Sequence, residues 1–376
     1  MSVRVLDGVA PQWPDHVGDD VPIHAGAPWI NASSHRLPRT RLTFLASEAG
    51  ANGGLLAGVV DDPAASEMIN LYRMLLAEPV VWKFPLDSVA ARDGLRAQVA
   101  PPEAWVPHLV VLYPGFDSFV AASGGPTPAL SGALADALLG WALEHEMKAV
   151  AFLYVRDDTE LPQVLAERGF RSVPLTFRSR LALGGNFDGY LASLSRNGRY
   201  QVARDRRQLA AEGIQTTRCS FEDVWPDLLK LRCYLVERYG QQADRELETT
   251  NLRQLLTCFG EDRMRLYCSY LDGRVVGFTL YVLWRDSWYL AYTGTYVTPQ
   301  TRSVYFDHVF YTPIPDAIAE GAAVVDMGIG AWEAKRRRGC TLTPVDLWVR
   351  ALDPIAGRAI DTAAAAMRRE VGWVTG

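Results

Sequence analysis

The hydrophobic pattern of the first half of the chain predicts strands alternating with amphipathic helices. Apolar residues cluster in short segments at 40–46, 105–114 and 149–155, as expected for half-buried or fully buried strands. Between the last two segments, leucines recur at helical spacing over 129–147 and predict an amphipathic helix. A strand at 173–183 closes this half. This order indicates an α+β unit whose sheet mixes antiparallel and parallel pairs.

A glycine-rich stretch at 184–186 separates this half from a second series of elements. One or two helices are predicted over 187–194 and 199–212, with a break near Asn197 and Gly198. We therefore expect a domain boundary at this stretch. The predicted segments are an N-terminal extension at 1–38, a first domain at 39–185 and a second domain at 186–376.

The rest of the second half predicts a hairpin, a helix and a strand. The dipeptide of Asp272 and Gly273 separates two alternating segments, which is a strong hairpin signal. A helix over 304–320 contains Pro313 and Pro315, so we expect an interruption at the prolines. The remaining predicted elements are strands at 287–296, 322–328 and 344–350 and a helix at 357–370.

The composition is that of a folded protein of about two domains. The 376 residues are 49% hydrophobic and 22% charged, which supports a sizeable core and excludes disordered, collagenous and coiled-coil chains. Arginine and lysine number 38 against 43 acids, a net charge of −5. The whole chain therefore carries no basic excess, no DNA partner is expected, and any other nucleic acid needs local basic patches.

Targeting and metal signals are missing from the sequence. No apolar run reaches the roughly 18 residues of a membrane span, and the acidic start lacks the features of a signal peptide, so we expect a cytoplasmic protein. The five cysteines show no CxxC spacing, which favours reduced structural thiols. The six histidines show no metal-binding spacing, so no metal is expected.

Two local clusters of arginine stand out against the acidic average. The segment 178–218 holds eight arginines and three acids, and a second cluster, KRRRG, occupies 335–339 after a predicted strand end. On one continuous helix the arginines of 196–207 could line phosphates, and the alternative is a solvated amphipathic face. The second cluster is either a substrate site or a solubilising loop. The predicted donor-binding set is Arg196, Arg199, Arg206, Arg207, Arg302 and Arg337.

Candidates for acid–base chemistry lie in the second half. His308, the only histidine there, is a candidate base, although a histidine among aromatic residues is more often a hydrogen-bonded core residue. Asp326 and Glu333 could orient an acceptor ammonium, and the alternative is a cap or turn carboxylate. With Lys335 these form the predicted catalytic set.

Aromatic residues are dense in the same half. Trp288, Tyr292 and Tyr305 are candidates for stacking on an adenine or holding an apolar acceptor, and core packing is the alternative. The sequence contains no GxSxG elbow, Cys–His motif or P-loop lysine. Direct attack of an amine on an activated ester or thioester needs no protein nucleophile and fits this pattern.

Three segments of the second half carry a family resemblance. They are FDGYLASLSRNGR at 187–199 followed by an arginine-rich helix, LDGRVVG at 271–277, and the stretch from Tyr305 to Gly328 that runs on to Lys335 and Gly339. Together they resemble the tandem acyltransferase fold shared by Fem-type peptidoglycan aminoacyl ligases and CelD-like GNAT proteins. The first half matches only in the order of its strands and helices.

The resemblance implies an α+β fold of two tandem GNAT-like domains, each a mixed, mostly antiparallel sheet flanked by helices. It also implies an acyltransferase, in which Lys335 matches the lysine that Fem-type ligases place beside the acyl donor. A cation there could contact the terminal adenosine phosphate or stabilise the tetrahedral oxyanion.

One departure bears on the donor. CoA-dependent GNAT enzymes usually carry a [QR]-x-x-G-x-[GA] loop whose backbone N–H groups bind the pyrophosphate. The corresponding segment here, 298–304, has Gln300 and Arg302 but no glycine. Fem-like ligases also lack this loop and take the acyl group from aminoacyl-tRNA.

The first hypothesis is therefore an aminoacyltransferase that moves an amino acid from aminoacyl-tRNA to a small amine, hydroxylamine or peptide. Aminoacyl-tRNA would be a co-substrate, and no cofactor is expected. The arginine-rich, lysine-poor composition indicates a high-GC bacterium and favours specialised metabolism such as antibiotic biosynthesis. The alternatives are an acyl-CoA-dependent N-acyltransferase and a catalytically silent GNAT-fold binding protein.

Overall fold

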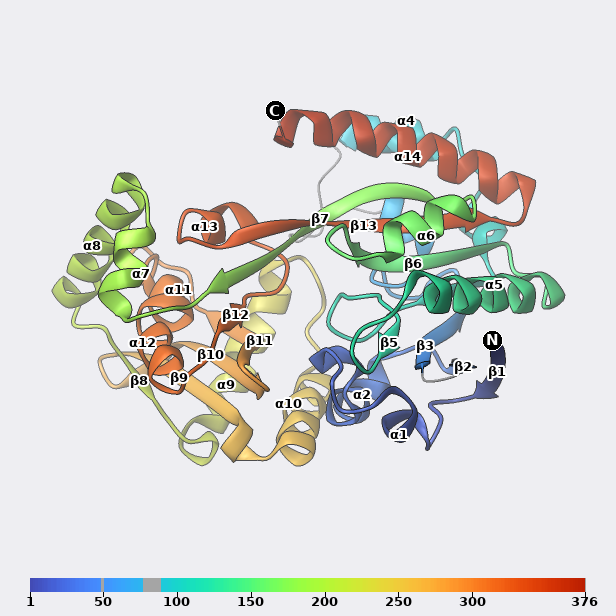
Figure 1. The fold of residues 1–376 in the computed structure, drawn as a ribbon. Coiled ribbons are helices and arrows are strands. Elements are labelled where there is room, and N and C mark those ends of the chain that lie inside the picture. Colours follow the sequence, from blue (N-terminus) through green and yellow to red (C-terminus); the bar gives the residue numbers. More distant parts are fainter. Residues whose placement is uncertain (49–50, 77–88, 376) are drawn as a thin grey trace. The chain divides into compact units, whose positions relative to one another are not determined.

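The computed structural model describes residues 1–48, 51–76 and 89–375, and the chain forms two compact units (Figure 1). Unit 1 comprises Met1–Phe177 and Thr343–Gly376, and unit 2 comprises Arg178–Leu342. Unit 2 is therefore inserted into unit 1 along the chain. The domain boundary at 184–186 stays a prediction.

Unit 1 is built on a mixed sheet. Its strands are β1 (Ser2–Asp7), β2 (Thr40–Glu48), β3 (Ala51–Val60), β4 (His108–Val111), β5 (Ala121–Ala122), β6 (Ala149–Arg156), β7 (Arg171–Ala182), which continues into unit 2, and β13 (Thr341–Ala351). The order is β1-β2-β3-β4-β6-β13-β7, and β5 pairs with β3. The first four strands pair antiparallel, whereas β4 and β6 are parallel.

Helices and short 3₁₀ turns complete unit 1. They are α1 (Trp13–Val17), η1 (Ile23–Ala25), α2 (Ala27–Ser33), η2 (Ser34–Arg36), α3 (Leu71–Leu76), α4 (Val89–Arg96), η3 (Pro102–Trp105), α5 (Pro128–Glu144), α6 (Leu161–Glu167) and α14 (Pro354–Thr375). The residues of the predicted N-terminal extension pack within this unit, because β1 pairs with β2 and Trp13 is buried in a core cluster.

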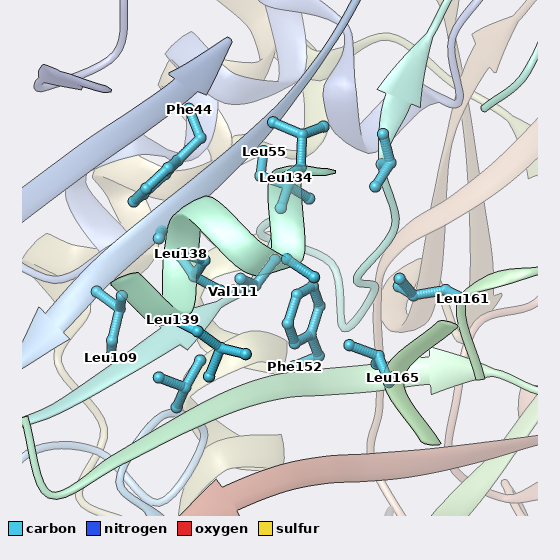
Figure 2. Close-up of a cluster of buried hydrophobic side chains, with 14 of the residues drawn as sticks. Phe44, Leu55, Leu109, Val111, Leu134, Leu138, Leu139, Phe152, Leu161 and Leu165 are labelled. Atoms are coloured by element: carbon cyan, nitrogen blue, oxygen red, sulfur yellow. The ribbon is translucent and has the colours of Figure 1, made fainter. Parts of the chain in front are cut away.

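Helix α5 confirms the amphipathic helix predicted at 129–147. It begins at Pro128 because the Thr127 side chain accepts a hydrogen bond from the Leu130 N–H at 3.2 Å, and proline is favoured in a first helical turn. Leu134 and Leu138 of α5 lie with Phe152 of β6 in a cluster of buried side chains (Figure 2). This helix crosses from β4 to the parallel strand β6 and packs its leucines onto the sheet.

The strands of unit 2 continue the pairing from β7, in the order β7-β12-β11-β10-β9-β8. Its strands are β8 (Gln215–Arg218), β9 (Met264–Leu271), β10 (Arg274–Trp284), β11 (Ser287–Thr295) and β12 (Val324–Asp326), besides the end of β7. Its helical segments are α7 (Phe187–Ser193), α8 (Arg196–Ala211), α9 (Phe221–Arg238), α10 (Arg245–Phe259), η4 (Glu261–Arg263), α11 (Val304–Phe306), the π-helix η5 (Asp307–Tyr311), α12 (Pro313–Ala319) and α13 (Trp332–Arg336). All neighbours pair antiparallel except β11 and β12.

The predicted hairpin at Asp272 and Gly273 is confirmed. Strands β9 and β10 pair antiparallel around these two residues, which have φ angles of 49° and 73°. Positive φ at both central residues is what a tight type I′ turn requires, and Asp-Gly tolerates it well.

The predicted break between two helices is confirmed, but it lies at Leu194 and Ser195, a few residues before Asn197 and Gly198. Helix α7 ends where Leu194 turns extended, and both residues lie in the first turn of α8. The Ser195 hydroxyl accepts a hydrogen bond from the Gly198 N–H at 3.0 Å and caps the new helix. A Cβ on Gly198 would lie 3.1 Å from the Arg337 carbonyl oxygen, so the glycine allows close packing there.

The helix predicted at 304–320 is interrupted, but before the prolines rather than at both of them: a π-helix precedes Pro313, and α12 continues through Pro315. After α11 the backbone widens over η5, where the Thr312 N–H donates to the Asp307 carbonyl at 3.0 Å, and α12 starts at Pro313. The Tyr281 hydroxyl donates to the Val309 carbonyl at 2.6 Å. A side chain of β10 thus satisfies a carbonyl in the irregular turn.

The predicted fold class, an α+β protein with mixed, mostly antiparallel sheets flanked by helices, is confirmed. Each unit carries an antiparallel run, then a helical crossover to a parallel strand: α5 between β4 and β6 in unit 1, and α11, η5 and α12 between β11 and β12 in unit 2. None of the described helices has the length and apolar character needed to cross a membrane.

Candidate functional site

The parallel strands β11 and β12 separate soon after they meet. They pair only where Ser287, Trp288 and Tyr289 lie beside residues 324–326. Strand β12 ends at Asp326, while β11 continues to Thr295. The two strands therefore part at Tyr289 and Asp326, and we call this point the splay. Sites in α/β folds commonly form at the carboxyl ends of such strands.

Lys335 lies immediately beyond the splay and is buried, with 3% of its surface exposed. Its Nζ donates hydrogen bonds to the carbonyl oxygens of Met327 at 2.6 Å and Ile329 at 3.0 Å, in the segment that follows β12. Burial lowers the pKa of the Lys335 ammonium to about 8. The amine is thus held at the end of β12, and it gives up its proton more readily than an exposed lysine does.

Asp326 is held in the same region by cations and a backbone group. Its Oδ2 accepts a hydrogen bond from the Arg178 Nε at 2.8 Å, and its Oδ1 accepts one from the Gly328 N–H at 2.8 Å. The Nε of Arg180, which lies directly opposite in the β7–β12 pair, is 3.9 Å from Oδ2. Asp326 therefore shapes the turn after β12 and anchors an arginine beside it.

A buried polar network joins helix α8 to the segment that carries Lys335. The Arg338 Nη2 donates to the Asp205 Oδ2 at 2.8 Å, and the Arg338 Nε donates to the Tyr311 hydroxyl at 2.9 Å. Tyr311 in turn donates to the same Asp205 oxygen at 2.8 Å, and the Ser303 hydroxyl donates to the other at 3.1 Å. The Arg338 guanidinium carbon also lies 3.1 Å from the centre of the Phe306 ring.

This network divides the KRRRG cluster between core and surface. Lys335 and Arg338 are buried, while Arg336 and Arg337 are exposed. Arg337 forms an ion pair with Glu333 at 2.6 Å one helical turn away, and both side chains are more than half exposed. Lys335 and Arg338 are thus structural anchors of the segment, and Glu333 and Arg337 form a surface pair away from its interior.

His308 lies in the core of unit 2 rather than at the splay. The Thr279 hydroxyl is hydrogen-bonded to its Nδ1, and the Thr295 hydroxyl is 2.8 Å from its Nε2. Full burial lowers the pKa of His308 to about 3, so the ring is neutral at physiological pH. Both ring nitrogens are occupied by threonines, and this geometry favours a structural role over that of a general base.

The arginines of α8 divide into two groups. The Arg199 Nη1 donates to the Leu194 carbonyl at 2.5 Å, and the Arg206 guanidinium lies 4.7 Å from the centre of the Phe187 ring. These two close the contact between α7 and α8. A second group shares another side of the helix and is exposed to solvent: Arg196, Arg204 and Arg207, with Tyr200, which is 57% exposed, among them.

The segment before α11, at the position where the sequence resemblance would place a pyrophosphate loop, forms hydrogen bonds between its own hydroxyls and N–H groups. The Thr298 N–H donates to the Thr301 hydroxyl at 2.9 Å, and the Thr301 N–H donates to the Thr298 hydroxyl at 3.3 Å. Arg302 points to α8, where its Nε donates to the Gln208 side chain at 2.8 Å. Two N–H groups that a phosphate would need are thus already satisfied.

The aromatic candidates are mostly part of the core. Trp288 is 2% exposed and lies in a hydrophobic cluster with Tyr281, 5.6 Å away between ring centres. Tyr292 is 9% exposed and lies under the Arg232 guanidinium at 4.9 Å. Tyr305 packs edge-on to Phe306 and His308. Core packing, the alternative to a role in stacking, thus accounts for the positions of all three side chains.

The structure therefore brings Lys335 and Asp326 together at the end of β12, while His308 is held in the core between two threonines, Glu333 is exposed and Trp288 is packed in the core. Sequence reasoning missed Arg178, Arg180 and Asp205. The alternation of Arg178 and Arg180 on β7 was the available signal, since both point to one face of a strand. Among the described residues, no group of three or more histidine, cysteine, aspartate or glutamate side chains is arranged to hold a metal ion.

Comparison with known families identifies the chain. The FemAB-like family, described as peptidoglycan biosynthesis/recognition, matches residues 114–372. This match spans more than half of the sequence, and the protein belongs to the FemAB-like family. No protein of curated function matches the sequence.

Among solved structures, FemX is similar over 94% of this chain and 98% of its own, with 13% identity and a TM-score of 0.58. A tandem GNAT protein from the clavulanic acid biosynthesis pathway covers 94% of this chain and 99% of its own, with 11% identity and a TM-score of 0.49. L-PGS from Bacillus licheniformis covers 69% of this chain and 82% of its own, with 13% identity and a TM-score of 0.46. At 13% identity, the likeness to FemX concerns the fold alone.

Lys335 should make folding stability depend on pH. Since burial lowers its pKa from 10.5 to about 8, the unfolded chain binds more protons than the folded one between these values, and stability from this position rises with pH. The unfolding free energy of the native protein, minus that of Lys335→Met, should increase between pH 8 and pH 9.5 by at most about 1.4 kcal/mol per pH unit. A difference that stays constant or falls, measured by urea denaturation, would show that Lys335 is not desolvated.

Proposed function

We propose that this protein is an aminoacyltransferase that moves an aminoacyl group from aminoacyl-tRNA to a small amine, hydroxylamine or peptide acceptor. The observation that carries the proposal is the buried Lys335 ammonium at the splay of unit 2, in a chain of the FemAB-like family. We place the reaction in the cytoplasm of a bacterium, in specialised metabolism, and assign the transfer chemistry to the predicted second domain, 186–376.

The proposed chemistry needs no covalent intermediate on the protein. The acceptor nitrogen attacks the ester carbonyl of the donor, a C–N bond forms, and the C–O bond to the ribose breaks. The acceptor nitrogen loses one proton, and the leaving ribose oxygen gains one. A cation at the position of Lys335 stabilises the negative charge that develops on the carbonyl oxygen, and a preorganised donor of this kind contributes on the order of 10²–10³ in rate.

The loop before α11 supports tRNA over CoA as the donor. Thr298 and Thr301 satisfy each other's N–H groups, and the segment has no glycine that would let a pyrophosphate approach its backbone. Aminoacyl-tRNA makes no demand on this loop, because its activated ester carries no pyrophosphate. The exposed arginines of α8 offer a surface for its phosphates.

The donor can be tested directly with purified protein. A pool of tRNA charged with labelled amino acids, mixed with a panel of amines, should yield labelled amides that disappear after ribonuclease treatment. Lys335→Ala should lower the transfer rate about 10²-fold or more, while Arg336→Ala, its exposed neighbour, should transfer at the native rate. Transfer that survives ribonuclease and requires acyl-CoA would overturn the proposal in favour of a CoA-dependent enzyme, and no transfer from either donor would favour a binding protein.

The exposed group on α8 should carry most of the tRNA affinity. The variant with Arg196→Gln, Arg204→Gln and Arg207→Gln should bind tRNA more weakly. The slope of the logarithm of affinity against the logarithm of salt concentration should become shallower by about 0.7–0.9 for each phosphate that is no longer neutralised. Fluorescence anisotropy at several salt concentrations measures both quantities.

The matched control is Arg274→Gln, at the start of β10, which removes an exposed arginine that is not on α8. It should leave tRNA affinity unchanged. Equal affinity of the triple variant and the native protein would show that tRNA binds elsewhere.

A further inference from the structure

Three strands present a row of polar side chains at the splay. Arg180 of β7 lies directly opposite Asp326 of β12, and Tyr289 of β11 lies beside Asp326 on the other side. Side chains of directly paired residues emerge on the same face of a sheet, and Arg178, two residues before Arg180, shares that face. The row therefore brings Arg178, Arg180 and Tyr289 around one carboxylate.

The two arginines in this row are in different situations. Arg178 is almost fully buried, with 4% of its side chain exposed, and its Nε is hydrogen-bonded to Asp326 at 2.8 Å. Arg180 is 37% exposed, and its Nε lies 3.9 Å from the same carboxylate oxygen, too far for a hydrogen bond. That Nε is buried and has no hydrogen-bond partner among the residues that the structure describes. Asp326 thus holds Arg178 directly and attracts Arg180 only through space.

A guanidinium in this position has unused binding capacity. A buried N–H without a partner costs free energy, on the scale of a missing hydrogen bond, unless a ligand satisfies it. The outer part of the side chain reaches solvent, so a ligand can approach it. Lys335 is close enough to Asp326 and Arg178 for their charges to act on it, which adds a further cation to this corner. The ligand that suits this group of cations is an oxyanion, because the planar guanidinium of arginine matches the oxygens of a carboxylate or phosphate.

We propose that Arg180 binds an oxyanion of the substrate, a carboxylate or a phosphate, at the splay of β11 and β12. The inference rests on the proposed function for its setting, since in aminoacyl transfer a phosphate belongs to the donor end and a carboxylate to an acceptor amino acid or peptide. Arg178 and Asp326 then act as positioning residues, which orient the row without contacting the ligand. Arg180 is the specificity-determining residue of this corner.

Binding of small probes to the full-length protein tests this without any tRNA. Inorganic phosphate and acetate are titrated separately at constant ionic strength, with chloride as the balancing ion, and affinity is read from the rise in melting temperature. We expect one of the two probes to bind. Binding of phosphate would show that the oxyanion belongs to the donor, and binding of acetate would show that it belongs to the acceptor. Arg180→Gln should weaken that binding about tenfold or more, because the charge-assisted, two-point hydrogen bonding of the guanidinium is removed.

Two further variants keep the test decisive. Arg180→Lys retains the charge but not the fork, and should bind between the native protein and Arg180→Gln. Arg274→Gln removes an exposed arginine at the start of β10, outside the row of Arg178, Arg180 and Tyr289, and should bind the probe as the native protein does. Neither probe binding better than chloride, or Arg180→Gln binding as well as the native protein, would overturn the proposal. If neither probe binds while tRNA-dependent transfer is intact, the proposal for Arg180 is wrong and the proposed function still stands.

Discussion

The buried ion pair between Asp205 and Arg338 is the interaction on which the site in unit 2 depends. It joins two segments that are 133 residues apart in the chain, helix α8 and the turn after α13. Tyr311 of the π-helix donates to the same Asp205 oxygen, so a third segment is held by it. A carboxylate this deeply buried is tolerated only when cations and hydroxyls satisfy it, and here Arg338, Tyr311 and Ser303 do so. The position of Lys335, three residues before Arg338, follows from this arrangement.

The charged side chains of unit 2 differ in how fully the protein itself engages them. Arg338 and His308 are fully engaged by neighbours inside the protein. Lys335 is buried at the strand splay and donates to backbone carbonyls, whereas Arg180 is partly exposed and lies 3.9 Å from Asp326. On α8, Arg199 and Arg206 hold α7, and the arginines on another side of the helix face solvent. A whole-chain charge of −5 says little about either site, because the relevant charges are local.

What could be predicted from the sequence was local. The hairpin at Asp272 and Gly273 and the leucine-rich helix α5 follow from turn chemistry and helical spacing, which need no knowledge of the rest of the chain. The start of α8 was missed because the Ser195 cap outweighs the helix-breaking tendency of Asn197 and Gly198. The pair of Asp205 and Arg338 and the burial of His308 between Thr279 and Thr295 could not be predicted, since each depends on residues brought together only by the fold.

A double-mutant cycle on Asp205 and Arg338 tests the central claim most directly. If this pair organises unit 2, Asp205→Ala alone should lower the unfolding free energy by about 3–5 kcal/mol, because it leaves the Arg338 charge buried without its partner. The double variant with Arg338→Met should recover much of that decrease, since it removes the unpaired charge as well. A single variant that costs less than about 1 kcal/mol, the range of exposed ion pairs, or a double variant whose cost equals the sum of the two single ones, would contradict the account.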